Sequence, residues 1–195
     1  MGDEFELSRK LQEHDKAWSL LYHRIGLWLT VYQGLEDSLD DLFVLFSRDV
    51  ESAARGVFSQ IHRLHGKLEA ITSVSLNHDQ DIQRLWTELR GEILYCAENR
   101  NQIAHSSGFA HGGTITVYSS GTITHTQTEP IAQARKRTKS GEVRWDAEKL
   151  LVEFRHLEAL LNKLGVLRHY LSNGSIPEHF KGRWNDPVVQ SWPTK

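Results

Sequence analysis

The chain has 195 residues, of which 39% are hydrophobic and 25% are charged, and its formal net charge at pH 7 is -2. This length suits one domain of ordinary size with a hydrophobic core of its own. The slightly negative charge excludes a protein that is basic over its whole surface. Any binding to nucleic acid or to a membrane surface must therefore come from a local patch.

The N-terminal segment and the cysteine content indicate where the protein works. Cys96 is the only cysteine, which excludes an internal disulfide and a cysteine-based metal cluster and favours a reducing compartment. The first ten residues, MGDEFELSRK, are acidic and lack the apolar core of a signal peptide. The longest nearly apolar run, IGLWLTVY, is much shorter than a membrane span. We expect a cytoplasmic protein with no membrane partner.

The first quarter of the chain carries one long helical pattern. Its apolar residues recur at alternating spacings of three and four over about four heptads, and they are Trp18, Leu21, Ile25, Trp28, Tyr32, Leu35, Leu39, Leu42 and Phe46. A period of 3.5 residues predicts a long helix with a coiled-coil-like seam. At 1.5 Å per residue, this helix would be about 40–50 Å long.

Two more helical patterns follow it. Asp49 is a suitable N-cap for a second helix, whose apolar residues are Val57, Phe58, Ile61, Leu64, Leu68 and Ile71. Asn77 or Asp79 would cap a third helix. One side of that helix carries Ile82, Leu85, Trp86, Leu89, Ile93, Cys96 and Ala97.

The period then changes from helical to two. The segment TITVYSSGTITHTQT, at about residues 114–128, alternates Ile115, Val117 and Ile123 with threonines around a glycine-containing turn. This pattern predicts a β-hairpin. Because two strands alone are marginally stable, we expect the hairpin to pack on helices or on another chain.

A fourth helical pattern follows the predicted hairpin. Asp146 would cap this helix and Asn173-Gly174 would end it; its apolar residues are Leu150, Phe154, Leu157, Leu161, Leu164 and Leu171. The sequence therefore predicts an all-α fold. It would be a four-helix bundle with long helices and a small β-hairpin inserted between helices three and four. This domain would span residues 1–174, and residues 175–195, which hold three of the four prolines, would form an irregular tail.

The end of the third predicted helix carries an unusual group of polar residues. In the stretch ILYCAENRNQIAHSSGFAHGG, residues 93–113, Arg100 is spaced like a core residue and falls in line with Ile82 and Ile93 on a helical wheel. A charge at the centre of an apolar stripe is costly unless it is paired or faces a polar cleft or an interface. Asn101 and His105 are four residues apart and share one flank of the helix. Such a conflict between pattern and residue is expected at functional sites.

The hexapeptide RNQIAH, residues 100–105, resembles the R-x(4–6)-H motif of the HEPN superfamily. These are all-α domains of bacterial toxin–antitoxin, abortive-infection and other RNA-targeting systems. Their motif places a polar residue, often asparagine, directly after the arginine, and here that residue is Asn101. The same spacing also occurs at Arg9/His14 and Arg55/His62, but only Arg100 combines a polar follower, a helix end and a position on the stripe. The helical frame that resembles the family covers roughly residues 14–172.

The resemblance implies a metal-independent endoribonuclease, acting in bacterial defence or as a toxin. Arg100 would hold the scissile phosphate, His105 would transfer a proton, and Asn101 would orient His105 or donate to the phosphate. The products would carry 2′,3′-cyclic phosphate and 5′-hydroxyl ends. Since one histidine is half of an acid–base pair, the resemblance also implies a homodimer with a composite cleft. No metal and no cofactor are expected.

Other interpretations stay open. Arginine and histidine also suit helix C-termini for dipole and capping reasons alone. The chain would then be a non-catalytic helical dimerisation module that binds RNA or a partner protein, such as an antitoxin or a nucleotidyltransferase. The segment ARKRTKSGEVR is either a solvated loop or a phosphate-contacting RNA-binding loop. Its candidate RNA-binding residues are Arg135, Lys136, Arg137 and Lys139.

Overall fold

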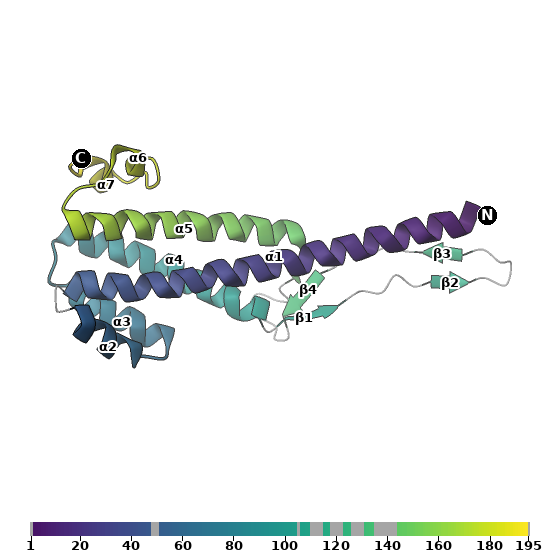
Figure 1. Ribbon diagram of the computed structural model, residues 1–195, viewed down its shortest axis with the longest axis horizontal. Helices are drawn as coiled ribbons and strands as arrows, with labels where there is room; N and C mark the ends of the chain where they lie inside the picture. Colours follow the sequence, from purple (N-terminus) through teal and green to yellow (C-terminus); the bar gives the residue numbers. More distant parts are fainter. Residues whose placement is uncertain are drawn as a thin grey trace. The chain divides into compact units, whose positions relative to one another are not determined.

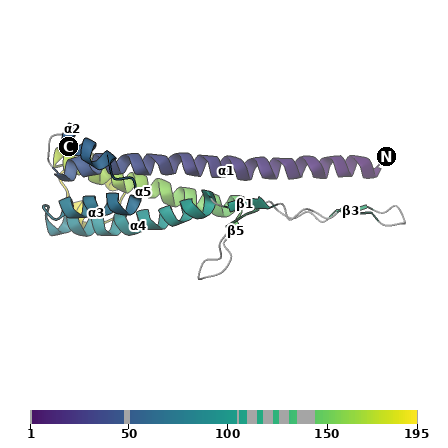
Figure 2. The ribbon, with the colours of Figure 1, turned by 90° about the horizontal axis from the view of Figure 1, so that it is seen from below.

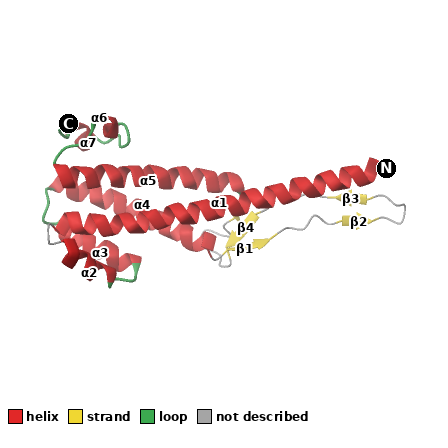
Figure 3. Ribbon diagram, viewed as in Figure 1, coloured by secondary structure: helices red, strands yellow, loops and turns green. Residues whose placement is uncertain are grey.

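The computed structural model describes residues 2–47, 51–104, 106–109, 115–117, 123–125, 131–134 and 144–194. These residues form seven helices and five short strands (Figures 1 and 3). The fold is mainly helical, which confirms the helical class predicted from the sequence. None of the helices in this part of the chain combines the length and the apolar character needed to cross a membrane.

The first helix, α1, runs from Gly2 to Ser47 and is longer than the predicted pattern. Its period of 3.5 residues is reflected in burial, because most residues of the predicted seam are buried: Leu21, Trp28, Tyr32, Leu35, Leu39, Leu42 and Phe46. Trp18 and Ile25 are half-buried. The predicted seam is therefore the buried face of α1.

The prediction of a single second helix is wrong, because the structure has two. Helix α2 covers Glu51–Ser59 and α3 covers Leu64–Ser75. The amide of Ile61 bonds to the carbonyl of Phe58 at 3.0 Å, a tight turn that ends α2. A Cβ at Gly66 would lie 2.9 Å from the Cγ2 methyl of Ile61, so a larger residue at position 66 would require this side chain to shift. The predicted N-cap Asp49 lies outside the described residues.

The two long helices that follow begin at caps that the sequence predicts, and the second of them also ends where the sequence predicts. Helix α4 spans Gln80–Ala104, and the Asp79 carboxylate accepts from the amide of Ile82 at 2.9 Å. Helix α5 spans Ala147–Asn173, and Asp146 accepts from the amide of Lys149 at 2.7 Å. Gly174 follows α5 with a φ of 65°, the left-handed conformation that favours glycine after a helix.

The chain divides into two compact units. Unit 1 comprises Met1–Thr30 and Glu98–Phe154, and unit 2 comprises Val31–Ala97 and Arg155–Lys195. The long helices α1, α4 and α5 each contribute one part to each unit. Each unit is described separately below.

Unit 1 contains the five strands. Strands β1 (Ser106–Phe109), β4 (Ile131–Ala134) and β5 (Arg144–Trp145) form an antiparallel sheet in the order β1-β4-β5. Strands β2 (Ile115–Val117) and β3 (Ile123–His125) pair antiparallel, with Ile115 opposite His125. These two strands lie within the range predicted as a hairpin, and the residues that connect them, 118–122, lie outside the described part of the chain.

Unit 2 contains all of the short helices together with parts of the long helices α1, α4 and α5. Helix α3 lies along α4 (Figure 2), where the indole of Trp86 donates to the Thr72 hydroxyl at 3.0 Å. Arg90 and Glu69 form an ion pair between the same two helices. These bonds fix α3 against the buried face of α4.

The C-terminal segment also belongs to unit 2, and the prediction that it is irregular missed two short helices. Helix α6 covers Glu178–Lys181 and α7 covers Pro187–Ser191. Trp192 stacks on Tyr170 of α5 with ring centroids 3.8 Å apart, and Asp186 accepts from Arg84 of α4 at 2.8 Å. The buried apolar residues of the segment are Ile176, Trp184, Val189 and Trp192. Residues 175–194 are therefore packed onto helices of their own unit.

Candidate functional site

The sequence places the candidate site at the C-terminal end of α4, in unit 1. Arg100 and Asn101 both lie in the last turns of this helix, which ends at Ala104. The third residue of the motif, His105, lies outside the described residues. The same holds for the candidate RNA-binding residues Arg135, Lys136, Arg137 and Lys139. The geometry that can be described is thus that of Arg100, Asn101 and the residues around them.

The buried face of α4 does not run through Arg100, which corrects the helical-wheel prediction. Four buried residues, Ile82, Leu89, Cys96 and Ile103, are seven residues apart. A face that repeats every seven residues drifts by about 20° per heptad relative to a wheel drawn at 3.6 residues per turn. After nearly three heptads the face has therefore moved to one side of Arg100. Arg100 is half-buried beside the stripe rather than at its centre.

Arg100 bonds to its neighbour in the motif. Its Nη1 donates to the side-chain oxygen of Asn101 at 3.2 Å, and Asn101 is exposed. Within the described part of the chain no carboxylate pairs with Arg100. Since a guanidinium keeps its proton in proteins, this half-buried group carries a positive charge that its neutral partner does not cancel. The arrangement leaves N–H donors of Arg100 for an anion.

Sequence reasoning missed the residue directly before Arg100. Asn99 is 7% exposed, and its Nδ2 donates to Oε2 of Glu153 on α5 at 2.8 Å, within the same unit. The sequence contained a signal for it, because Asn99 lies three residues after Cys96 and four before Ile103, which is the spacing of the buried stripe of α4. A buried amide bonded to a carboxylate ties the last turn of α4 to α5 and so holds the backbone that carries Arg100.

The structure also records where potential metal ligands lie. In residues 51–104, His62 and His65 are both exposed, and His65 lies 3.8 Å from the Glu69 carboxylate. No group of three or more histidine, cysteine or acidic side chains in the described residues is arranged to hold a metal ion.

No protein-family model, curated protein or solved structure matches the chain. The resemblance of RNQIAH to the HEPN motif therefore stays a prediction made from the sequence.

Proposed function

We propose that the protein is a metal-independent endoribonuclease of the HEPN type. Its frame would be a four-helix bundle with a hairpin between the third and fourth helices, and its role would lie in bacterial defence or in a toxin–antitoxin pair. One observation carries the proposal. Arg100 is a half-buried cation at the end of α4 whose recorded partner is the neutral amide of Asn101.

The proposed reaction uses only side chains of the motif. The ribose 2′-oxygen attacks the adjacent phosphorus, the bond from phosphorus to the 5′-oxygen breaks, and the products are a 2′,3′-cyclic phosphate and a 5′-hydroxyl. His105 takes the proton from the 2′-hydroxyl or gives one to the leaving 5′-oxygen, because the imidazole pKa in general lies near neutrality. Arg100 stabilises the charge that develops on the phosphate oxygens. Asn101 keeps the guanidinium in place or donates to the phosphate.

The complete acid–base pair would require two copies of the chain. A two-fold homodimer would bring two histidines to one cleft. Unit 1 supports association through large apolar side chains that are exposed: Leu20, Tyr22, Leu27 and Val152, at 44%, 58%, 41% and 61%. Light scattering at micromolar concentration should report about 45 kDa, twice the 22.4 kDa of the chain. A monomer would contradict the composite site.

A second candidate function rests on the same exposed side chains. A non-catalytic helical module would use them to bind a partner protein, for example an antitoxin or a nucleotidyltransferase. Arg100 and Asn101 would then serve the helix end and the interface alone.

A cleavage assay separates the two functions. Purified protein should cut single-stranded RNA in the presence of EDTA and leave 2′,3′-cyclic ends. His105→Ala should lower the rate by roughly 10²–10⁴-fold, the usual scale of general acid–base catalysis. His62→Ala is the matched control, because His62 is exposed and follows Arg55 with a similar spacing but without the polar follower. If no RNA is cut, or if both variants lose activity equally, the ribonuclease proposal fails and the binding module becomes the better explanation.

A further inference from the structure

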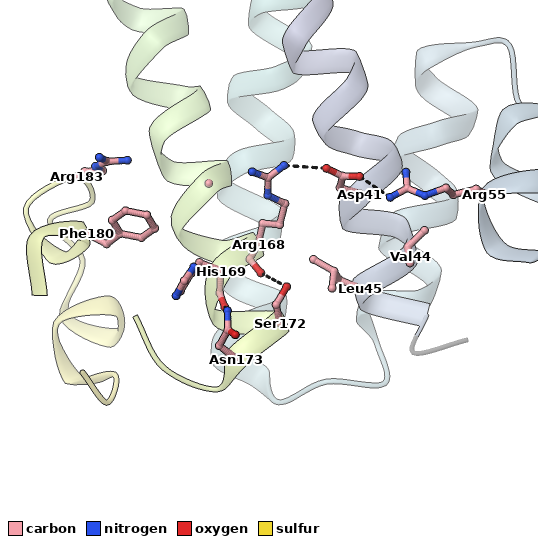
Figure 4. Close-up of a pocket in the computed structure, with 11 residues that line it drawn as sticks. Asp41, Val44, Leu45, Arg55, Arg168, His169, Ser172, Asn173, Phe180 and Arg183 are labelled. Carbon is pink, nitrogen blue, oxygen red and sulfur yellow. Dashed lines mark hydrogen bonds and ion pairs between the residues drawn. The ribbon is translucent and has the colours of Figure 1, made fainter. Parts of the chain in front are cut away.

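Unit 2 contains a pocket of about 410 Å³, and the residues that line it are far in sequence from RNQIAH. It is lined by residues of α1, α2, α5 and α6 and by Arg183 after α6 (Figure 4). The lining includes three arginines, Arg55, Arg168 and Arg183, and one carboxylate, Asp41. None of the residues of the proposed ribonuclease site takes part, so the pocket requires an explanation of its own.

Asp41 holds two of the three arginines. Its Oδ1 accepts from Nη2 of Arg55 at 2.7 Å, and its Oδ2 accepts from Nη1 of Arg168 at 2.8 Å (Figure 4). Burial by itself would raise the pKa of Asp41, but the two guanidinium hydrogen bonds and charges lower it below the ordinary value. Asp41 is therefore a carboxylate at neutral pH and fixes both cations before any ligand arrives. Such preorganisation reduces the entropy lost on binding.

The third arginine is held in a different way. The guanidinium carbon of Arg183 lies 4.4 Å from the centroid of the Phe180 ring, a cation–π arrangement. Among the described residues no carboxylate pairs with Arg183. The contact with the ring uses no N–H group of the guanidinium, and no hydrogen bond of these groups is found within the described residues, so they can serve an anion.

The charges of the lining do not cancel. The lining holds three guanidinium groups and one carboxylate, so it is a basic pocket in a chain whose net charge is -2. A phosphate monoester carries about -1.5 to -2 at pH 7, so a basic pocket attracts it more strongly than it attracts a single carboxylate. Guanidinium forks also match the geometry of phosphate oxygens.

The size of the pocket indicates more than a bare ion. A volume of about 410 Å³ lies within the range of roughly 300–1,000 Å³ that is typical of small-molecule sites. Val44 and Leu45 of α1 supply apolar wall on the side away from Arg183 (Figure 4). We infer that this pocket binds a small organic phosphate monoester, with the phosphate between Arg168 and Arg183 and the organic part against the apolar wall.

Gly165 of α5 offers a way to test the pocket without removing a charge. Glycine in the interior of a helix is unfavourable relative to alanine. A Cβ at Gly165 would have no neighbouring heavy atom within 4 Å, so packing within the protein does not require glycine here. Because Gly165 lines the pocket, a large side chain at this position would occupy space that the ligand needs.

The experiment is a calorimetric titration of the full chain with phenyl phosphate at 150 mM salt, where weak unspecific attraction is screened. Phenyl phosphate should bind one per chain and saturate. Phenol should not bind, and benzoate and inorganic phosphate should each bind at least about tenfold more weakly than phenyl phosphate. Arg183→Gln removes a guanidinium that forms no ion pair among the described residues, and it should weaken the binding of phenyl phosphate by about 10–100-fold. Gly165→Leu should weaken this binding at least as much.

Two matched variants control for charge and for helix propensity. Arg63→Gln removes an exposed arginine outside the pocket, and Gly91→Leu changes a helical glycine of α4 whose Cβ would also meet nothing within 4 Å. Both should bind phenyl phosphate like the unchanged chain, and circular dichroism should show that all four variants are folded. Absence of saturable binding would overturn the inference. The inference would also be overturned if benzoate bound as tightly as phenyl phosphate, or if Arg63→Gln weakened the binding of phenyl phosphate as much as Arg183→Gln does.

Discussion

Arg84 and Arg90 in unit 2 differ from Arg100 in unit 1 in the side chain that they bond. In unit 2, Arg84 donates to Asp186 at 2.8 Å and Arg90 pairs with Glu69. In unit 1, Arg100 is half-buried like Arg90, yet its recorded partner is the neutral amide of Asn101. Burial is similar in the last two cases, and the partner is what differs.

The partner indicates what each arginine does. A guanidinium that has a carboxylate to itself joins two segments, and its charge is largely cancelled within the protein. A guanidinium bonded only to an amide keeps its charge for a ligand or a partner molecule. We therefore expect substitutions of carboxylate-paired arginines to change stability, and a substitution of Arg100 to change activity.

The largest expected effect comes from Arg100→Lys. Lysine keeps the charge but loses the planar fork, so RNA cleavage should fall by about 10²–10³-fold, the scale of losing one transition-state donor. The free energy of unfolding should change by less than about 0.5 kcal/mol. Arg84→Lys is the matched change at a carboxylate-paired arginine, and it should lower stability while activity persists. Initial cleavage rates and urea unfolding measure both quantities. Equal loss of stability in the two variants would erase the distinction between them.

The next largest effect should come from the residue beside Arg100. Asn99→Ala removes a buried donor to the Glu153 carboxylate and should lower the free energy of unfolding by about 1.5–3 kcal/mol. Asn101→Ala, two positions further and exposed, should lower it by less than about 0.5 kcal/mol. Urea unfolding followed by circular dichroism compares the two. The assignment of Asn99 as a structural residue is wrong if the two losses are the same.

The features that the sequence predicted well depend on local chemistry. The seam of α1 follows from its period of 3.5 residues, the start of α4 follows from Asp79, and the two ends of α5 follow from Asp146 and Gly174. Each of these signals is carried by residues within one turn or one heptad. Local rules were therefore enough to place them.

The features that were not predicted from the sequence depend on the fold, or on the gradual drift of a heptad repeat around a helix of 3.6 residues per turn. The apolar spacing continues from Phe58 to Leu68 across the turn between α2 and α3, so periodicity alone joined two helices into one. Helices α6 and α7 have four and five residues, too short to show a period. The wheel placed Arg100 on the buried face because it ignored the drift of a heptad repeat. The pocket of unit 2 joins Asp41 to residues more than 120 positions later, which no local pattern reports.

The carboxylate of a paired arginine offers a smaller, pH-dependent test. The hydrogen bond from Arg84 lowers the pKa of Asp186 below its ordinary value, against the effect of burial and with help from the amide of Val188. A lowered folded-state pKa means that the stabilisation is present above the unfolded pKa of about 3.9 and is lost as the pH falls through the folded pKa.

Asp186→Asn should therefore lower the free energy of unfolding by about 1 kcal/mol at pH 7, because asparagine keeps the capping oxygen but loses the charge. The difference from the unchanged chain should shrink as the pH is lowered below about 4, since the unchanged chain loses the same contribution there. Urea midpoints between pH 3 and 7 measure this. Asp146→Asn is the control, because Asp146 caps α5 through the amide of Lys149 and has no arginine partner among the residues that the structure describes; it should change stability little. A constant difference at every pH would show that the charge of Asp186 is not what stabilises the segment.

The smallest expected effect is a gain in stability at Gly165. Alanine at this position adds a Cβ that meets no heavy atom within 4 Å and removes the backbone entropy cost of a helical glycine, so the free energy of unfolding should rise by about 0.5–1 kcal/mol. Gly91→Ala should give a similar gain, because a Cβ there is equally free of neighbours. The two variants should differ in ligand binding, since only Gly165 lines the pocket of the three arginines. Phenyl phosphate should stabilise the Gly165→Ala protein less than the Gly91→Ala protein in thermal melts. That result would show that glycine at residue 165 leaves space for the ligand and is not required by the fold. Equal stabilisation of the two would mean that the ligand does not reach α5 at this position.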